Sequence, residues 1–362
     1  MREIVIVIAD LYLEPELPGR SGDAAVAMDL LPPGRAPASD ASPGVAAARG
    51  IEHLARFGDR STLPDGWRAW VAHWVGLPQY AGEAPASVAS APLAATLAPR
   101  AVWLATPLHL TAGLTSLHFD RRSLLRLPRA EGEELAASFR ETFQGSGLDL
   151  HPLESGELLL SGPPPPAPAT TTEPARLLLT SVAEALAVGE GALALRRLSA
   201  EIEMWLHGHP VNARRAQRGA PAIATLWVWG GGAPAISPPT ATRELVDVAF
   251  GSDAYVRGLW RLAGGEIRPM PLDWPAVIGE PRAPRVLGVV EVAELLHANA
   301  SWRLADAMAE IDRRLVSPSL DALHRGELHR LVLVANDRCL TLRAAHRWRL
   351  WRGKRTALEA LT

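Results

Sequence analysis

The sequence predicts an α/β protein with a central, largely parallel or mixed sheet flanked by helices, and a smaller α+β subregion beside it. Residues 4–9 form a continuous apolar, β-branched run, which is typical of a strand covered on both faces. Strand-like and helix-like segments then alternate along the chain, as they do in α/β folds. The 362 residues, 48% of them hydrophobic and 21% charged, suffice for one large or two closely packed domains.

The first hundred residues are predicted to form the N-terminal part of the α/β core. Residues 4–9 give its first strand, and residues 31–44 are too rich in Pro, Gly, Ser and Ala for regular structure, so we expect a long surface loop there. Apolar residues then recur at helical spacing after the turn at 64–66, namely Trp67, Trp70, Val71 and Trp74. Such a stripe indicates core packing or a subunit contact rather than a cofactor site.

Residues 101–161 are predicted to form the smaller α+β subregion. The expected elements are strands at 101–110 and 114–119, a helix at 131–144, and a hairpin of strands 148–150 and 157–160. Pro107 implies an edge or a bulge in the first of these strands. The proline-rich residues 162–174 are predicted to be a stiff linker and the main internal boundary.

Residues 175–362 are predicted to be the C-terminal part of the α/β core, including the distinctive segment 201–232. One helix is expected to end near His207, and two more are expected at 253–262 and 302–315, with strands at 245–248 and 286–290. Two further strands, 331–334 and 339–342, are expected to form a terminal hairpin.

Segment 201–232 carries the candidate ligand pocket. Gly208 and Pro210 are expected to end one helix, Asn212 to cap a short helix at 213–218, and residues 222–229 to form a buried strand. The three glycines that follow this strand let a backbone approach a ligand closely, and ligands of open α/β sheets gather beyond strand carboxyl ends. A tight turn under a packed helix is the alternative. The candidate pocket residues are His207, His209, Asn212, Arg215, Trp229, Gly230, Gly231 and Gly232.

Two further interpretations of this segment remain open. His207 and His209 could share a metal ion with Glu203, but a histidine at a helix end more often contacts the last carbonyl groups. Arg214, Arg215 and Arg218 could bind phosphate, although on a short surface helix such arginines are more often solvated.

At these residues the chain resembles the bacterial RpfE-like regulatory proteins, which are often described as phosphoglycerate mutases. The resemblance rests on E-I-x-M-x-L-H-x-H-P-V-N-x-x-R at 201–215, R-G-x-P at 218–221 and L-W-x-W-G-G-G at 226–232. Weaker matches are T-P-L-H-L at 106–110 and H-R-W-R-L-W-R at 346–352. The segment is also similar to the archaeal-type cofactor-independent phosphoglycerate mutases of the alkaline phosphatase superfamily, which implies a mixed or parallel sheet between helices.

The resemblance implies a metal-bound serine nucleophile and two divalent ions held by Asp and His clusters, because the metals activate the hydroxyl and neutralise the phosphoryl group. Asp10 lies where the first metal aspartate is expected, but Leu11 replaces the glycine that should follow. No P-G-S-D-x-A-H-like or G-H-D-G-D-like segment occurs, and the late strand is followed by Asp337 without an adjacent histidine. Asp10 and Asp337 are therefore weak metal candidates, and we expect the metal site to be lost.

The sequence lacks the motifs of several other functional classes. The chain has no G-x-S-x-G, G-x-x-x-x-G-K-[ST] or G-x-G-x-x-G sequence in the required place. A net charge of -2 gives no general affinity for nucleic acid, and the basic, tryptophan-containing tail at 343–355 fits an edge strand better than a base-stacking surface. With Cys339 as the single cysteine, no internal disulfide can form, and we expect a cytoplasmic protein without a membrane segment.

These observations predict a non-catalytic or degenerate phosphoglycerate mutase-like protein with a regulatory or binding role. Its expected partner is an unknown small molecule or protein, and we expect no cofactor. A metal-dependent mutase or phosphohydrolase with displaced ligands, in which Asp10, Asp337 and His209 converge on divalent ions, is the first alternative. Nucleic-acid binding through the basic tail, which we do not expect, is the second.

Overall fold

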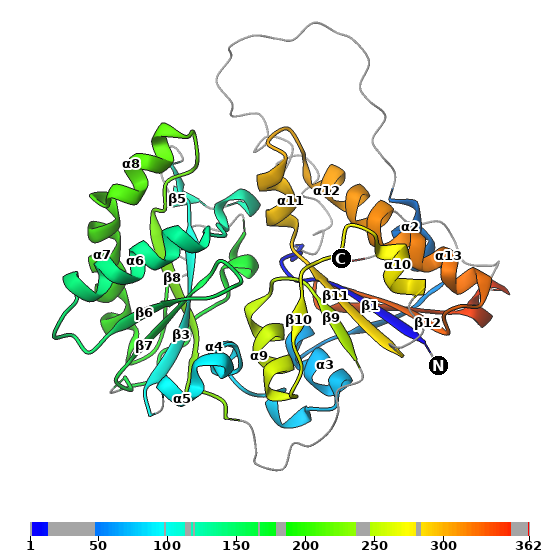
Figure 1. Ribbon diagram of the computed structural model, residues 1–362, viewed down its shortest axis with the longest axis horizontal. Coiled ribbons are helices and arrows are strands. Elements are labelled where there is room, and N and C mark those ends of the chain that lie inside the picture. Colours follow the sequence, from blue (N-terminus) through cyan, green and yellow to red (C-terminus); the bar gives the residue numbers. More distant parts are fainter. Residues whose placement is uncertain are drawn as a thin grey trace, which may run out of the picture.

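The computed structural model describes residues 2–13, 48–97, 99–112, 117–118, 120–165, 167–178, 186–236, 247–279, 284–348 and 361. Figure 1 shows two lobes, each built around its own sheet. The predicted loop at 31–44, most of the predicted strand 114–119 and most of the basic tail lie outside the described residues.

The large lobe contains a mixed sheet, which in the described residues has seven strands in the order β10-β9-β11-β1-β12-β13-β2. β1 lies at its centre, parallel to both β11 and β12, while β13 and β2 are antiparallel. The fold class predicted from the sequence, a central mixed sheet flanked by helices, is confirmed. The strands are β1 (Glu3–Ile8), β2 (Asp59–Thr62), β9 (Val248–Phe250), β10 (Ile267–Arg268), β11 (Arg285–Val290), β12 (Arg330–Ala335) and β13 (Arg338–Arg343).

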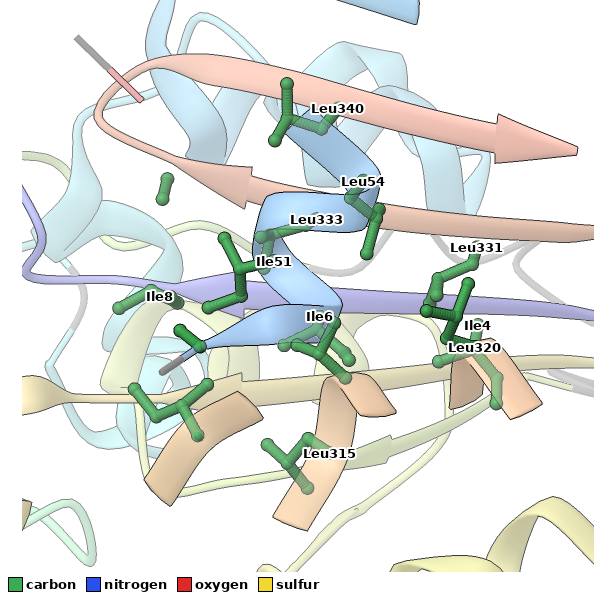
Figure 2. Close-up of a cluster of buried hydrophobic side chains, with 14 of the residues drawn as sticks. Ile4, Ile6, Ile8, Ile51, Leu54, Leu315, Leu320, Leu331, Leu333 and Leu340 are labelled. Carbon is green, nitrogen blue, oxygen red and sulfur yellow. The ribbon is translucent and has the colours of Figure 1, made fainter. Parts of the chain in front are cut away.

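Helices cover both faces of this sheet, which explains why β1 is apolar throughout. Ile4, Ile6 and Ile8 point to one face, where they pack against Ile51 and other apolar side chains (Figure 2). Val5 and Val7 point to the opposite face. The first face carries α2 (Arg49–Phe57), α10 (Trp274–Gly279), α11 (Val292–Ala298), α12 (Leu304–Ile311), a π-helix (Asp312–Val316) and α13 (Ser317–Arg325); the second carries α3 (Gly66–Val75) and α9 (Ala254–Leu262).

The predicted tryptophan stripe lies on α3. Trp67 is buried in the core of the second face, as predicted for a packing role. Trp70 and Trp74 are partly buried and stack on each other with ring centroids 6.4 Å apart.

The small lobe contains an antiparallel sheet, with the described strands in the order β6-β7-β3-β8. The predicted hairpin of β6 and β7 is confirmed. The strands are β3 (Ala101–Leu108), β6 (Asp149–Pro152), β7 (Leu158–Gly162) and β8 (Thr225–Gly232); the helices are α4 (Pro85–Ala89), α5 (Ala94–Leu97), α6 (Arg129–Thr142), α7 (Ala192–His207) and α8 (Pro210–Gln217). A separate pair, β4 (Thr111–Ala112) and β5 (Leu117–His118), completes the described strands.

Segment 201–232 lies in the small lobe and not, as predicted, in the core around the large sheet. Its strand β8 pairs with β3, because Leu226 and Val228 of β8 pack into the apolar cluster under α6, α7 and α8. The predicted linker 162–174 leads from β7 towards α7, so it runs between two parts of this same lobe. The exact division of the chain into domains stays a prediction.

The lobes contact each other on either side of a polar pocket. On one side α4 crosses α9, and an added Cβ on Gly258 would lie 1.9 Å from the carbonyl oxygen of Val88. On the other side the Arg122 guanidinium donates to the carbonyl oxygens of Ala300 at 3.0 Å and Trp302 at 2.7 Å, beyond the end of α11. Among the described helices, none has both the length and the apolar character needed to span a bilayer.

Candidate functional site

Three acidic residues lie directly beyond neighbouring strands of the large sheet. Asp10 follows β1, Asp253 follows β9 and Glu291 follows β11. Because these strands are parallel, their carboxyl ends meet at one edge of the sheet, where α/β proteins usually bind ligands. Each of the three is no more than 5% exposed.

The small lobe covers this edge and encloses a small pocket, which we call the inter-lobe pocket. Among the described residues, its ionisable lining consists of five carboxylic acids and two arginines, with Tyr255 as a further polar group. The acids and arginines are Asp10, Glu157, Glu173, Asp253, Glu291, Arg68 and Arg126.

Asp10 is bound to the backbone at the start of α11. Its two carboxylate oxygens accept hydrogen bonds from the amide groups of Val292, at 2.6 Å, and Ala293, at 2.7 Å. Burial, together with the neighbouring Glu291, raises the pKa of Asp10 to about 6. The side chain thus satisfies the first amides of a helix, which is a structural role.

Arg126 joins the two lobes through carboxylates. Its Nε donates to Glu291 of the large lobe at 2.9 Å, and its guanidinium lies 3.5 Å from Glu157 of the small lobe. Glu157 also accepts a hydrogen bond of 3.1 Å from Thr106, which in turn accepts one of 2.9 Å from the Trp229 indole. A continuous chain of ion pairs and hydrogen bonds therefore crosses the pocket.

Arg68 fills the other half of the pocket. It donates two parallel hydrogen bonds, of 2.8 and 2.9 Å, to the carboxylate of Glu173. Its guanidinium carbon lies 4.5 Å from the ring centroid of Trp67, 5.2 Å from that of Trp229 and 6.0 Å from that of Tyr255. Bidentate pairing and aromatic stacking together hold this cation firmly. Although burial opposes ionisation, Arg68 holds the pKa of Glu173 below its usual range.

Asp253 caps a helix and lies at the outer limit of ion-pair distance from Arg68. One carboxylate oxygen accepts from the Val256 amide at 2.9 Å and caps α9, while the other lies 3.9 Å from Arg68. Burial, outweighing Arg68 and reinforced by Glu157 and Glu291, raises the pKa of Asp253 to about 6.

The divalent ions implied by the sequence resemblance do not fit this donor set. The carboxylates already bind backbone amides or guanidinium groups, and the described part of the chain contains no group of three or more His, Cys, Asp or Glu side chains that could hold a metal. Asp337 pairs with Arg176 instead. The predicted convergence of Asp10, Asp337 and His209 on a metal is therefore not found.

Of the candidate pocket residues predicted from the sequence, all of which are described, Trp229 lines the inter-lobe pocket. Asn212 is not the cap of its helix, because Pro210 already occupies the first turn and α8 begins there. The Asn212 amide instead donates to the carbonyl oxygens of Leu206 and Ile223, each at 2.9 Å, and accepts from the Ile223 amide at 2.8 Å. It ties the end of α7 to the segment that leads into β8.

His209 is the residue that caps α8. It is 5% exposed, its Nδ1 accepts from the Val211 amide at 3.2 Å, and its ring meets Trp205 edge-on at 5.1 Å. His207 and Glu203 are both exposed. His209 thus has a structural role, but as the cap of the following helix and not at the last carbonyl groups of α7 as predicted; the metal interpretation finds no ligand group among the described residues.

The arginines of α8 pair with acids of α6, so they are neither a phosphate site nor simply solvated. Arg215 is buried and donates to Glu131 and to the carbonyl oxygen of Pro221, each at 2.6 Å. Arg218 pairs with Glu131 as well, and Arg214 pairs with Glu134. Sequence spacing within α8 could not reveal partners on another helix.

The glycines 230–232 continue β8 rather than forming a loop. Gly230 has a positive φ of 63° and lies against Pro85, and an added Cβ on Gly231 would lie 2.1 Å from the Trp103 indole nitrogen. Gly232 is equally close to Ser87, where a Cβ would lie 2.2 Å from the hydroxyl. Close packing against α4 and β3 thus accounts for these glycines, as the steric alternative predicted.

Sequence reasoning missed most of the pocket. Glu291 directly follows the predicted strand 286–290, and Asp253 begins the predicted helix that comes after the strand 245–248, so their positions could have indicated them. Arg68 lies among the tryptophans of α3, and nothing local marks its partner Glu173, which is 105 residues away.

Comparisons with known proteins show distant structural similarity alone. No protein-family model and no curated protein matches the chain. A cofactor-independent phosphoglycerate mutase from Thermoplasma acidophilum is 16% identical, with a TM-score of 0.37 over 95% of this chain and 90% of that chain. The PH0037 protein from Pyrococcus horikoshii is 13% identical, with a TM-score of 0.45 over 92% and 82%.

Proposed function

We propose that this chain is a non-catalytic binding or regulatory protein, built on a two-lobed α/β scaffold. At the sheet edge where such folds usually bind ligands, arginines of the chain itself occupy the space between the carboxylates. The observation that carries the proposal is the position of Arg68 and Arg126, whose guanidinium groups lie among the carboxylates at the carboxyl edge of the large sheet.

This arrangement opposes metal-dependent phosphoryl transfer for an electrostatic reason. A divalent ion requires several free oxygen ligands at roughly 2.0–2.6 Å. Here it would have to displace the bidentate Arg68 guanidinium from Glu173 or the Arg126 guanidinium from Glu291, and would then face that cation at short range. The pairing of these carboxylates with arginines therefore supports a site that binds no metal.

The sequence resemblance supports descent from a phosphoglycerate mutase-like ancestor, as in the RpfE-like regulatory proteins. The same sequence lacks the serine nucleophile segment that this chemistry needs. We propose a cytoplasmic protein that acts by binding a small molecule or another protein, without a cofactor.

Metal analysis of the purified protein, combined with mutase and phosphatase assays, tests this proposal. After incubation with Mg²⁺, Mn²⁺ or Zn²⁺ and desalting, we expect less than stoichiometric metal and no turnover of 3-phosphoglycerate or of p-nitrophenyl phosphate above the blank. Two retained ions per chain together with turnover would refute the proposal.

An arginine variant provides a matched control. Arg126→Met removes the cation from Glu291 and Glu157. If Arg126 excludes metal, this variant should bind divalent ions more tightly than the wild type, as measured by calorimetry. The exposed Arg129→Met variant should behave like the wild type.

A further inference from the structure

Two histidines from separate helices lie against each other on the large lobe. His53 comes from the middle of α2, and His324 comes from the last turn of α13. These helices lie side by side on the same face of the large sheet (Figure 1). The centroids of the two imidazole rings are 5.3 Å apart, and their planes are inclined by 75°. Neither ring lines the inter-lobe pocket.

The separation of the two rings is that of two imidazoles bound to one metal ion. Zinc binds a histidine nitrogen at roughly 2.0–2.1 Å and prefers tetrahedral geometry. Allowing for the size of the ring, two such ligands place their ring centroids about 5 Å apart. The observed 5.3 Å agrees with this value. An edge-on contact between two rings can produce the same separation, so the distance alone does not define a site.

The Nε2 atom of His53 provides the second observation. It is buried, and it has no hydrogen-bond partner among the described residues. Buried polar atoms are nearly always bonded, because leaving one unbonded costs free energy. The His53 ring also packs against Phe57, with the two centroids 4.6 Å apart, and an apolar ring offers no acceptor. A metal ion shared with His324 would give this nitrogen a partner.

The surroundings of the pair determine which ion fits. His324 is exposed, so a hydrated ion can reach it from solvent. The described part of the chain offers no group of three or more metal-binding side chains, so water would complete the coordination shell. Imidazole ligands favour Zn²⁺, Ni²⁺ or Cu²⁺ over Mg²⁺ and Ca²⁺. Arg56, whose guanidinium lies over the Phe57 ring, places a positive charge nearby and should make the binding reversible.

We propose that His53 and His324 form a two-histidine site for a divalent ion of the zinc type, which links α2 to α13. The linked helices both cover the first face of the large sheet, so the bound ion stabilises that lobe. This inference goes beyond the proposed function and does not depend on it. An ion at this pair lies outside the inter-lobe pocket and supports no phosphoryl transfer there, so the two proposals can fail separately.

Calorimetric titration of the full chain near neutral pH tests the site. We expect one Zn²⁺ to bind per chain and Mg²⁺ not to bind at the histidine pair. His324→Gln changes an exposed side chain, which leaves the fold intact, and should weaken zinc binding at least about tenfold because an amide is a poor zinc ligand. His53→Gln should have the same effect. Zinc should also raise the melting temperature of the wild type but not that of His324→Gln.

A third histidine provides the matched control. His73 is exposed on α3, which covers the opposite face of the large sheet. His73→Gln should therefore keep the zinc affinity and the thermal stabilisation of the wild type. Failure of the wild type to bind zinc, or an unchanged zinc affinity in His324→Gln, would overturn the proposal.

Discussion

At the scale of single residues, the inter-lobe pocket depends on buried charges that cannot be removed one at a time. Arg126 is bound to two acids that are themselves at most 5% exposed. An ion pair of this kind contributes little net stability relative to an apolar replacement of the whole group. Removing one partner, however, leaves the other charges buried and unpaired.

Arg126→Ala should therefore lower the free energy of unfolding by roughly 3–5 kcal/mol. Urea denaturation measures this value. Arg129→Ala, which breaks an exposed pair with Glu133, should leave it close to the wild-type value. Equal effects of the two substitutions would show that Arg126 is not held as the structure describes.

The structural role of Asp10 predicts a pH dependence with a definite sign. Since its folded pKa is raised to about 6 by burial and Glu291, its contribution to stability is complete below about pH 4 and is lost as the pH rises through 6. Asp10→Asn should be less stable than the wild type because an amide cannot accept from both backbone groups. The difference should shrink by on the order of 1 kcal/mol between about pH 5 and pH 8 in urea unfolding. A difference that grows over this range would contradict this role.

At the scale of elements, local patterns could be predicted from the sequence and contacts between elements could not. The strand at residues 4–9 could be predicted because both of its faces are apolar, and that pattern is local. The role of Asn212 could not, because its partner Ile223 lies outside the helix, in the segment between α8 and β8. The start of α8 could have been predicted from the sequence, because proline is common at the first position of a helix.

Asn212→Ala should lower the free energy of unfolding by about 2–4 kcal/mol, because it removes the acceptor of the Ile223 amide and a donor to the carbonyl oxygens of Leu206 and Ile223. Thermal denaturation followed by circular dichroism measures the effect. Asn212→Asp should not restore stability, since a carboxylate cannot donate to the two carbonyl oxygens. If the Asp variant matched the wild type, the described bonding would be incorrect.

The crossing of α4 and α9 depends on Gly258. Gly258→Ala should lower the free energy of unfolding by about 1–3 kcal/mol, since its methyl group would meet the backbone of Val88 and force the lobes apart. Gly82→Ala, which has open space around the new methyl group, should change stability by less than about 0.5 kcal/mol. Chemical denaturation of both variants provides the comparison.

At the scale of the whole molecule, the chain combines a mixed seven-stranded sheet and an antiparallel four-stranded sheet in its described residues. The sequence predicted the first from its apolar runs but assigned segment 201–232 to the wrong sheet. Strand pairing between β8 and β3 joins residues more than a hundred positions apart, and no local pattern encodes that choice. For the same reason the inter-lobe pocket, assembled from both lobes, could not be located from motifs.

Anomalous diffraction from crystals grown with Mn²⁺ and inorganic phosphate tests the central claim most directly, because it locates any metal at the carboxyl edge of the large sheet. We expect no anomalous peak within coordination distance of Asp10, Asp253 or Glu291, with the Arg126 guanidinium still bound to Glu291. A peak at roughly 2 Å from two or more of these carboxylates, with Arg126 displaced, would contradict it.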